Sequence, residues 1–349
     1  MGEVTAFSRG LVLDGRYRLE RPLAEGGMGS IWVGRQIALE REVAVKLLRV
    51  GSSAPLRERL RREALALAAV HHPSVVQVFD FGETADGSPY LVMELVRGEP
   101  LGARLHRAGP FAATDAAQLL LPLLEGLSVA HRAGVIHRDI KPDNVVLAPG
   151  PAGPQPKLLD FGIARIHGGE SARLTADGGF LGTPAYMAPE QVKGLVADER
   201  ADVWGVGAVL YEMLAGRAPF GVEDVMTVIR RVVDEPPSFP RDARGLDGRL
   251  WGVIMTALRK EPEQRYPSAL AFREGLAAWL ESKGITPPSN PAFQAVDTLP
   301  ATASPDERLA STVEAAAVSV SRRVQPPPLH ADGGSTSLDA LIRAKLGQS

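Results

Sequence analysis

The chain has 349 residues, 45% of them hydrophobic, which is enough for a sizeable core in one large two-lobed domain plus a tail. Its formal charge of −2 gives no basic surplus, so neither a nucleic-acid partner nor an anionic membrane is indicated. The absence of cysteine excludes disulfides, thiol nucleophiles and cysteine-ligated metals. No apolar run approaches the ~18–20 residues of a membrane span and no secretion signal is visible, so we expect a cytoplasmic protein.

Residues 1–16 form a short leader without a convincing pattern. Three β-rich segments follow, at residues 17–23, 30–35 and 43–48, and predict strands of an antiparallel sheet. The first turn, residues 24–29, is rich in glycine, and missing side chains let backbone amides approach phosphate oxygens closely. A glycine hairpin without a ligand is the alternative, and the turn alone does not decide between the two.

Lys46 lies in the third of these segments, between Val45 and Leu47. A lysine in an apolar strand needs an anionic partner, and nucleotide phosphates together with a carboxylate would suffice. The next segment, residues 56–70, predicts a helix that is basic at its start and carries Glu63.

Two more strands are predicted at residues 75–81 and 90–95. Residues 97–110 contain three glycines and two prolines, which marks the passage to a second, helical lobe. The first long helix of that lobe is expected at residues 115–130.

Residues 135–144 read Val-Ile-His-Arg-Asp-Ile-Lys-Pro-Asp-Asn and carry a dense set of reactive groups. Asp139 can orient and deprotonate a hydroxyl, Lys141 can neutralise charge on a transferred phosphoryl group, and the amide of Asn144 can hold a metal ion. A polar loop between two apolar strands is the plain alternative. The order His-Arg-Asp, then Lys, then Asn resembles the catalytic loop of protein kinases.

Further motifs carry the same resemblance. Residues 160–162 read Asp-Phe-Gly, and residues 182–190 match the substrate-docking stretch of serine/threonine kinases. Over roughly residues 17–280 the motifs occur in the family's order, and Leu-Leu-Asp-Phe-Gly-Ile-Ala-Arg is similar to the bacterial, eukaryotic-like branch of these kinases. The resemblance implies an α+β, two-lobed protein kinase fold, with a β-rich N-lobe with one helix at about 17–96, a mainly helical C-lobe at about 97–280, and ATP in the cleft.

The resemblance assigns catalytic roles to four residues. Asp139 would be the base, with Lys141 beside it, and Lys46 would contact the nucleotide phosphates and pair with Glu63. The alternative for Glu63 is a helix-surface pair with Arg59 four residues earlier, which contributes a few tenths of a kcal/mol.

Asn144 and Asp160 resemble the family's magnesium ligands. Met93 would be the gatekeeper behind the adenine, and residues 94–96 the hinge. Ala24 stands where the family carries its first glycine, and its Cβ should slightly stiffen the turn. The residues expected to contact ATP are Ala24, Glu25, Gly26, Gly27, Met28, Gly29, Ile31, Ala44, Lys46, Met93, Glu94, Val96 and Val146.

Two features of the C-lobe would support the site. Asp202 opens a buried helix and resembles the aspartate that anchors the catalytic loop from beneath. Arg265 resembles the arginine that pairs with Glu190. A surface ion pair would contribute little, whereas a buried pair would hold the geometry of the lobe.

Residues 163–182 are polar and rich in glycine and would form the activation segment. Thr183, in the docking stretch, favours a serine or threonine acceptor over tyrosine. Arg138 is a cation beside the base, and a phosphate on Thr175 would supply its anion, with Ser171 as the rival site. A solvated hydroxyl at Thr175 is the plain alternative.

Residues 281–349 predict a disordered tail rich in Pro, Ser and Ala, because after Gly284 they include a single aromatic residue, Phe293. A short amphipathic helix at residues 338–346 would be one route for partner docking through this tail, although such stripes are more often incidental. A homodimer for self-phosphorylation is a further expectation.

Two functions from different classes remain open. The first is a serine/threonine kinase that transfers the γ-phosphoryl group of ATP, with Mg²⁺, to hydroxyls of protein substrates and of its own activation segment. The second is a pseudokinase, a scaffold that binds nucleotide or protein without chemistry. Pseudokinases typically lack one of the key groups, whereas Lys46, Asp139, Asn144 and Asp160 are all present, which favours the enzyme.

Overall fold

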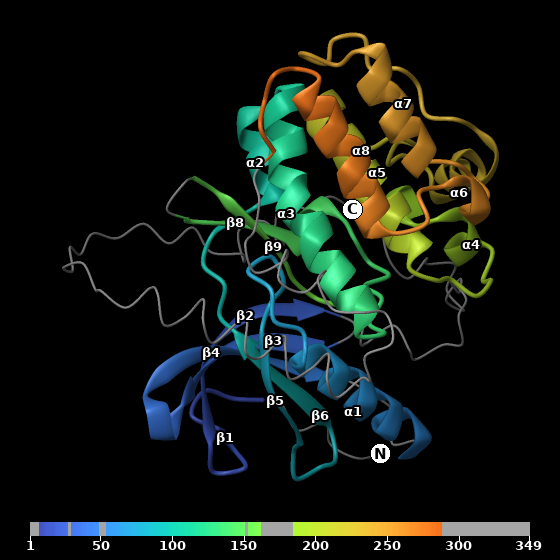
Figure 1. The fold of residues 1–349 in the computed structure, drawn as a ribbon. Helices are drawn as coiled ribbons and strands as arrows, with labels where there is room; N and C mark the ends of the chain where they lie inside the picture. Colours follow the sequence, from blue (N-terminus) through green and yellow to red (C-terminus); the bar gives the residue numbers. More distant parts are fainter. Residues whose placement is uncertain (1–6, 27–28, 49–53, 151–152, 162–183, 288–349) are drawn as a thin grey trace, which may run out of the picture.

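The structure is a computed structural model that describes residues 7–26, 29–48, 54–150, 153–161 and 184–287. Within these residues the chain folds into a β-rich N-lobe with one helix and a mainly helical C-lobe, as the resemblance implied (Figure 1). Of the predicted tail, only its first residues, up to 287, are described, and they continue from the end of the last helix.

The N-lobe holds an antiparallel sheet of six strands in the order β1-β2-β3-β4-β6-β5. The strands are β1 (Val12–Leu13), β2 (Tyr17–Gly26), β3 (Gly29–Gln36), β4 (Arg41–Leu48), β5 (Val78–Glu83) and β6 (Pro89–Glu94). Strand β1 lies inside the segment that the sequence analysis assigned to the leader. Leu13 pairs with Tyr17 and is buried, so the sheet begins before the predicted start of the lobe.

Strand β4 is buried on both faces, which meet different parts of the molecule. Val45 and Leu47 join a small core within the N-lobe, whereas Ala44 and Leu48 join the main core that continues into the C-lobe. Because successive side chains of a strand point to opposite faces, Lys46 shares the second face with Ala44 and Leu48. The alternation therefore places the lysine toward the junction of the lobes.

Helix α1 (Ala54–Ala68) packs against β5. Leu60, Ala64 and Leu67 are buried, and their spacings of four and three residues place them on one stripe of the helix. Glu63 lies beside this stripe and is partly exposed. The helix is thus held by its apolar stripe, and its acidic residue is left at the edge of the packed face.

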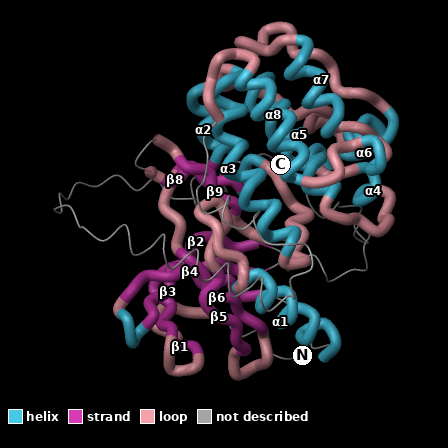
Figure 2. The backbone as a smooth tube through the Cα atoms, in the orientation of Figure 1, coloured by secondary structure: helices cyan, strands magenta, loops and turns pink. Residues whose placement is uncertain are grey.

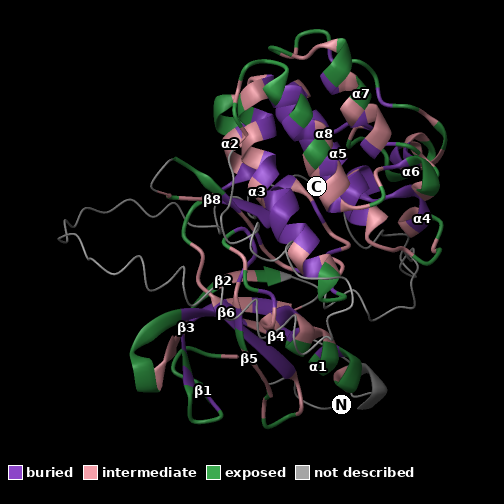
Figure 3. Ribbon diagram, viewed as in Figure 1, coloured by how far each residue is buried: buried purple, intermediate pink, exposed green. Residues whose placement is uncertain are grey.

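The C-lobe is built around helices α3 and α5, which are buried over most of their length (Figure 3). Its helices are α2 (Leu101–Ala108), α3 (Ala113–Arg132), α4 (Pro189–Val192), α5 (Arg200–Ala215), α6 (Val225–Asp234), α7 (Gly248–Ala257) and α8 (Ala269–Glu281). None of the helices in the described part of the chain has the length and apolar character needed to cross a membrane.

A second sheet of three short strands lies at the junction of the lobes (Figure 2). Its strands, in the order β7-β8-β9, are β7 (Glu99–Pro100), β8 (Val145–Ala148) and β9 (Gln155–Leu158). The predicted catalytic loop leads into β8, and Asp160 follows β9. Antiparallel pairing of β8 and β9 brings these ends together, and the backbone N–H of Leu159 donates to the carbonyl of Asn144 at 2.8 Å.

Candidate active site

Asp139, the predicted base, lies in the loop between α3 and β8, and two donors hold its carboxylate. Lys141 Nζ lies 3.1 Å from Asp139 Oδ2. Asn144 Nδ2 donates to the same oxygen at 3.1 Å and to the backbone carbonyl of Asp139 at 2.7 Å. Asn144 is buried in a single turn of 3-10 helix, Pro142–Asn144, in which the proline ring fixes φ. The structure therefore brings together the three groups that the sequence singled out in this loop.

His137 joins this loop to the end of β9. It is fully buried, its Nδ1 accepts from the backbone N–H of Asp139 at 3.2 Å, and its Nε2 donates to the carbonyl of Leu159 at 2.7 Å. These partners require the neutral tautomer with its proton on Nε2. Burial lowers the pKa of His137, although the nearby carboxylates oppose this shift. Sequence reasoning gave His137 no structural role; the apolar pair at residues 135–136 was the available signal that its ring is buried.

Asp202 anchors the loop from helix α5, as predicted. Its Oδ2 accepts from the backbone N–H of His137 and its Oδ1 from that of Arg138, both at 2.8 Å. Burial opposes ionisation of this carboxyl, but His131, 2.8 Å away, and the backbone donors outweigh burial and lower the pKa of Asp202. Arg138 has a φ of 62°, in the left-handed region that non-glycine residues rarely adopt. The buried aspartate therefore helps to hold a strained backbone next to the base.

Glu190 and Arg265 form the buried pair that the sequence analysis expected. Arg265 Nη1 and Nη2 donate to the two carboxylate oxygens of Glu190, each at 2.6 Å, and neither side chain is more than 7% exposed. Arg265 also donates to the backbone carbonyls of Arg200, Arg259 and Lys260. Because every donor of the planar guanidinium group is used, the pair ties α4 to α5 and to the segment before α8.

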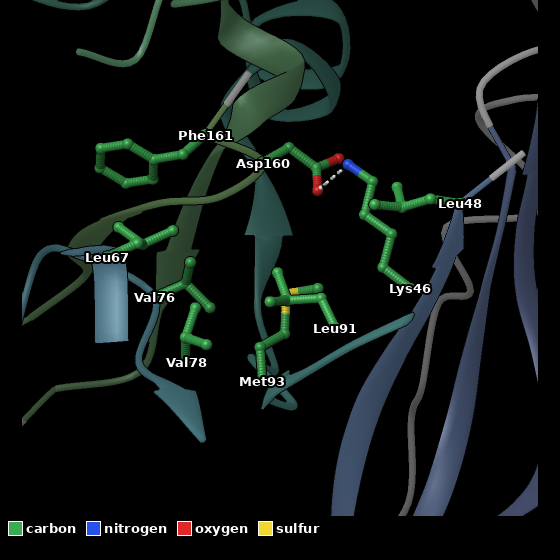
Figure 4. A pocket seen from close by; sticks show the side chains of 9 residues that line it. All are labelled: Lys46, Leu48, Leu67, Val76, Val78, Leu91, Met93, Asp160 and Phe161. Atoms are coloured by element: carbon green, nitrogen blue, oxygen red, sulfur yellow. Dashed lines mark hydrogen bonds and ion pairs between the residues drawn. The ribbon is translucent and has the colours of Figure 1, made fainter. Parts of the chain in front are cut away.

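Lys46 and Asp160 face each other across the junction of the lobes (Figure 4). Lys46 Nζ lies 2.8 Å from Asp160 Oδ1. Burial opposes ionisation of Asp160, but the charge of Lys46 outweighs it and lowers the pKa of Asp160. Asp160 has a φ of 51°, and a non-glycine residue in this region costs about 1–3 kcal/mol and is common at functional sites. Lys46 thus has the anionic partner that its apolar strand requires.

The expected pair of Lys46 with Glu63 is not formed in the structure. Glu63 Oε1 lies 3.6 Å from Nε of Arg59, four residues earlier, which is the alternative named for it. Burial raises the pKa of Glu63, and the charges of Arg138 and Arg59 lower it only in part. The physical reason for the correction is that Asp160 already supplies a carboxylate to Lys46, while Glu63 faces two guanidinium groups.

A small cavity, here called the back cavity, lies beside the Lys46–Asp160 pair. It holds about 10 Å³, room for about one water molecule, so the adenine of a nucleotide does not fit there. Its other walls are apolar, and the predicted gatekeeper Met93 forms one of them. The lining residues are Lys46, Leu48, Leu67, Val76, Val78, Leu91, Met93, Asp160 and Phe161 (Figure 4).

The described residues predicted to contact ATP come from β2, β3, β4, β6 and β8 and from the hinge that follows β6. Ala44 lies opposite Met93 in the sheet, and Ile31 lies opposite Lys46. Gly29 has a φ of 140°, and a Cβ at this position would lie 1.9 Å from the carbonyl oxygen of Leu47. Only glycine fits this close approach, so the glycine has a packing reason in addition to the proposed contact with phosphate.

Glu94, the first residue of the predicted hinge, is tied to both lobes. Its backbone N–H donates to the carbonyl of Gln77 at 2.9 Å. Its carboxylate lies 2.6 Å from Nζ of Lys157 on β9. Sequence reasoning missed Lys157, because a lysine at the end of a short strand reads as a solvated residue unless its partner is known.

Several predicted residues cannot be placed. They lie outside the described residues and are Gly27, Met28, Ser171, Thr175 and Thr183. Their roles stay predictions from the sequence.

The side chains present fit a divalent metal that is shared with a nucleotide. Mg²⁺ usually takes one or two carboxylates and completes its shell with waters and substrate phosphates. Asn144 uses Nδ2 on Asp139, which leaves its Oδ1 as an acceptor, and Asp160 uses Oδ1 on Lys46. Among the described residues, no group of three or more carboxylate or histidine side chains could hold a metal unaided. The amide and carboxylate oxygens would therefore hold it together with phosphate oxygens.

Comparison with known proteins agrees with this geometry. The family described as protein kinase domain matches residues 17–274. The chain is 42% identical over 274 residues to the serine/threonine-protein kinase pkn2 of Myxococcus xanthus, covering 77% of this chain and 33% of that protein. It is 39% identical over 276 residues to the serine/threonine-protein kinase PknA of Mycobacterium tuberculosis, covering 77% of this chain and 62% of that protein.

A third relative also matches the region after the catalytic domain. The chain is 34% identical over 342 residues to the serine/threonine-protein kinase pkn3 of Myxococcus xanthus, covering 95% of this chain and 60% of that protein. The chain thus spans between one third and about three fifths of the length of these relatives. With a family match across both lobes and relatives that are about 40% identical over the same region, the chain belongs to the protein kinase family, in its bacterial, eukaryotic-like serine/threonine branch.

Proposed function

We propose that the protein is a serine/threonine protein kinase that transfers the γ-phosphoryl group of ATP to hydroxyls of protein substrates. The observation that carries the proposal is the set of three contacts on Asp139: Lys141 and Asn144 on its carboxylate and His137 on its backbone. Such an arrangement positions one carboxylate for a proton transfer. Positioning of groups, together with electrostatic stabilisation, is the main contribution of a protein to phosphoryl transfer.

In the proposed reaction, the Ser or Thr hydroxyl loses its proton to Asp139 as its oxygen bonds to the γ-phosphorus. The bond from that phosphorus to the β,γ-bridging oxygen breaks, and ADP leaves with the bonding electrons. Lys141 offers positive charge beside Asp139, and Lys46 offers it beside Asp160. A magnesium ion bound by Asn144 and Asp160 would neutralise charge on the phosphates.

ATP would lie between the sheet of the N-lobe and β8. Its phosphates would lie under the turn that contains Ala24, Glu25, Gly26 and Gly29, and its adenine would lie between Ala44 and Val146, in front of Met93. The backbone of Glu94 and Val96 would read the edge of the adenine. Ion pairing with Lys157 supports this role for Glu94, because it fixes the hinge against β9.

The test is transfer of label from γ-labelled ATP to a generic protein substrate, with Mg²⁺ and with a chelator, followed by phosphoamino-acid analysis. We expect phosphoserine and phosphothreonine that depend on the metal and are lost in Asp139→Asn. An Asp115→Asn variant, with the same change on an exposed first turn of α3, is the matched control and should be active. Nucleotide binding without any transfer would instead favour the pseudokinase alternative.

Magnesium is tested separately from the base. An Asp160→Ala variant removes the carboxylate proposed for the metal, so metal-dependent nucleotide binding should fall together with transfer. Asp139→Asn should keep that binding. Equal nucleotide affinity of the wild-type protein with and without Mg²⁺ would argue against the proposed metal site.

Regulation follows from the same assignment. Phosphorylation of Thr175, or of Ser171, would place an anion near Arg138, and Thr183 would help dock the acceptor residue. Self-phosphorylation between two copies would supply this phosphate. Mass spectrometry should find phosphate on Thr175 in freshly purified wild-type protein and not in Asp139→Asn; full activity of Thr175→Ala would rule out the switch.

The tail and the compartment are also proposals. A variant that ends at Gly284, after α8, should keep transfer to a generic substrate, because α8 and its last buried residue, Leu280, are retained and, among the described residues removed, only Ile285 packs against the main core. A cytoplasmic location is consistent with the lack of cysteine. We propose that the segment after Gly284 serves for docking of partners and not for catalysis. A large loss of thermal stability on truncation would show that this segment packs on the kinase domain.

A further inference from the structure

Gln191, on the short helix α4, forms hydrogen bonds in two directions to backbone groups. Its Oε1 accepts from the backbone N–H of Ala188 at 3.0 Å. Its Nε2 donates to the backbone carbonyl of Arg138 at 2.9 Å. The partners fix the orientation of the amide, since an N–H needs an acceptor and a carbonyl needs a donor.

The second of these bonds reaches the strained residue beside the base. Arg138 has a φ of 62°, which costs about 1–3 kcal/mol and persists only when surrounding contacts hold it. Its N–H donates to Asp202 at 2.8 Å, and its carbonyl accepts from Gln191. The two bonds therefore clamp Arg138 from both ends.

The carbonyl of Arg138 belongs to the peptide group that also contains the N–H of Asp139. That N–H donates to Nδ1 of His137 at 3.2 Å. Because a peptide group is planar, a hydrogen bond at each edge fixes its rotation. The direction in which the side chain of Asp139 leaves the backbone follows from that rotation.

We propose that Gln191 is a positioning residue for Asp139, acting through the carbonyl of Arg138. The proposal rests on the kinase activity proposed above. The bonds of Gln191 also join two parts of the site, because Ala188 lies in the stretch that resembles the substrate-docking segment, while Arg138 precedes the proposed base. One amide therefore sets the distance between the segment that would hold the acceptor and the carboxylate that would take its proton.

The competing explanation is that Gln191 only caps α4. Ala188 is the N-cap residue and has no side chain to cap the helix, so the bond from its N–H to Gln191 could be the whole role. Two substitutions separate these roles. Gln191→Glu keeps an oxygen that accepts from Ala188 but places a second oxygen against the carbonyl of Arg138, whereas Gln191→Met removes both bonds.

The experiment measures kcat, the KM for ATP and the melting temperature for wild type, Gln191→Glu and Gln191→Met. The matched control is Gln155→Glu, which adds the same charge at an exposed position on β9. We expect kcat to fall about 5- to 100-fold in both Gln191 variants, because the partly buried carbonyl of Arg138 loses its hydrogen-bond donor. The KM for ATP should stay unchanged, and the melting temperature of Gln191→Glu should fall by no more than a few degrees, so the loss of kcat is measured on folded protein.

A pH series gives a readout that a helix cap would not move. Protonation of the new glutamate creates an O–H that can donate to the carbonyl of Arg138. The activity of Gln191→Glu relative to wild type should therefore rise as the pH is lowered from 8 to about 5.5. Wild-type kcat in Gln191→Glu, with a loss only in Gln191→Met, would show that Gln191 is a cap alone and would overturn the proposal.

Hydrogen–deuterium exchange separates this proposal from the proposed function. The amides of residues 135–141 should exchange faster in both Gln191 variants and at the wild-type rate in Gln155→Glu. Unchanged exchange in Gln191→Glu would overturn the positioning role even if the enzyme is active. If the Gln191 variants exchange faster but the wild-type protein transfers no phosphate, the positioning role stands and only the kinase activity is refuted.

Discussion

The catalytic loop and helix α1 both present carboxylates that the proposed reaction needs, yet the two are held in different ways. In the loop, the backbone around Asp139 is bonded to Asp202, Gln191 and His137. On α1, the carboxylate of Glu63 has a single ion pair within the described residues, with Arg59 on the same helix at 3.6 Å. Asp139 is thus held by hydrogen bonds to groups from several elements, whereas Glu63 has one ion pair, with its own helix, and otherwise only the more distant charge of Arg138.

The difference follows from where the partners come from. Buried polar groups must find hydrogen bonds, so the C-lobe, whose core contains Asp202 and Glu190, holds its loop rigidly. Glu63 lies beside the apolar stripe of α1, and its partly exposed ion pair with Arg59 contributes little free energy, so the carboxylate can leave Arg59 for Lys46. We therefore expect the C-lobe half of the site to be preformed, and the N-lobe half to exchange partners when a nucleotide and metal engage Asp160.

The largest expected effect is that of Asp139→Asn on turnover. Removal of the proton acceptor should lower kcat by about 10²–10⁴-fold, because general-base catalysis contributes in this range. ATP affinity and the melting temperature should stay near wild type, since the amide can keep the contacts of the loop. Steady-state kinetics and calorimetry check this, and unchanged turnover would contradict the mechanism.

The next effect concerns the scaffold of the preformed half. Arg265→Met leaves Glu190 buried without its partner, which should cost about 3–5 kcal/mol of unfolding free energy. Arg200→Met removes a more exposed pair with Asp198 and should cost less than about 1 kcal/mol. Urea unfolding of both variants gives the comparison; equal losses would mean that burial of the first pair does not matter.

A smaller effect is expected on the other half of the site. Glu63→Gln should lower kcat/KM by about 10- to 100-fold if Glu63 re-pairs with Lys46 during turnover, a charged hydrogen bond of about 1.5–3 kcal/mol. Glu58→Gln, on an exposed turn of the same helix, is the control and should have little effect. Wild-type kinetics in Glu63→Gln would show that the pair with Arg59 persists throughout the reaction.

The smallest effect is expected for the surface pair itself. Arg59→Ala releases Glu63 from a contact worth a few tenths of a kcal/mol, so kcat/KM should rise by less than about twofold. Arg62→Ala, which loses a similar pair with Glu58, should leave the rate unchanged. A fall of several-fold in Arg59→Ala would mean that Arg59 supports the active arrangement instead of competing with it.

Much of the fold and of the loop chemistry could be predicted from the sequence, because both depend on local pattern. The apolar run around Lys46 indicated that the lysine needs an anionic partner, and the buried helix with Asp202 anchored the loop as expected. The motif around Asp139 put its three side chains in contact because they lie close together in one loop, which ends in the 3-10 turn Pro142–Asn144.

The ion-pair partners at the junction of the lobes could not be predicted in the same way. Two carboxylates, those of Glu63 and Asp160, were candidates to pair with Lys46, and only the distances show that Asp160 does so in this structure. Lys157 was missed because its partner, Glu94, is distant in sequence. Gln191 was missed because its partner beside Asp139, the carbonyl of Arg138, is both distant in sequence and a backbone group, which carries no sequence signal. Strand β1, near the N-terminus, was missed because two residues are too few to show the alternation of apolar and polar residues that indicates a strand.

Distance measurements between spin labels test the central comparison most directly, and the chain has no cysteine to interfere with labelling. One pair, Arg62→Cys with Ala278→Cys, joins exposed positions on α1 and α8; a second, Lys193→Cys with Ala278→Cys, lies within the C-lobe. On addition of Mg²⁺ and a non-hydrolysable ATP analogue, we predict that the first distance changes by about 2 Å or more while the second stays constant. Two constant distances with the analogue bound would contradict a mobile N-lobe half, and a change in the second would contradict a preformed C-lobe half.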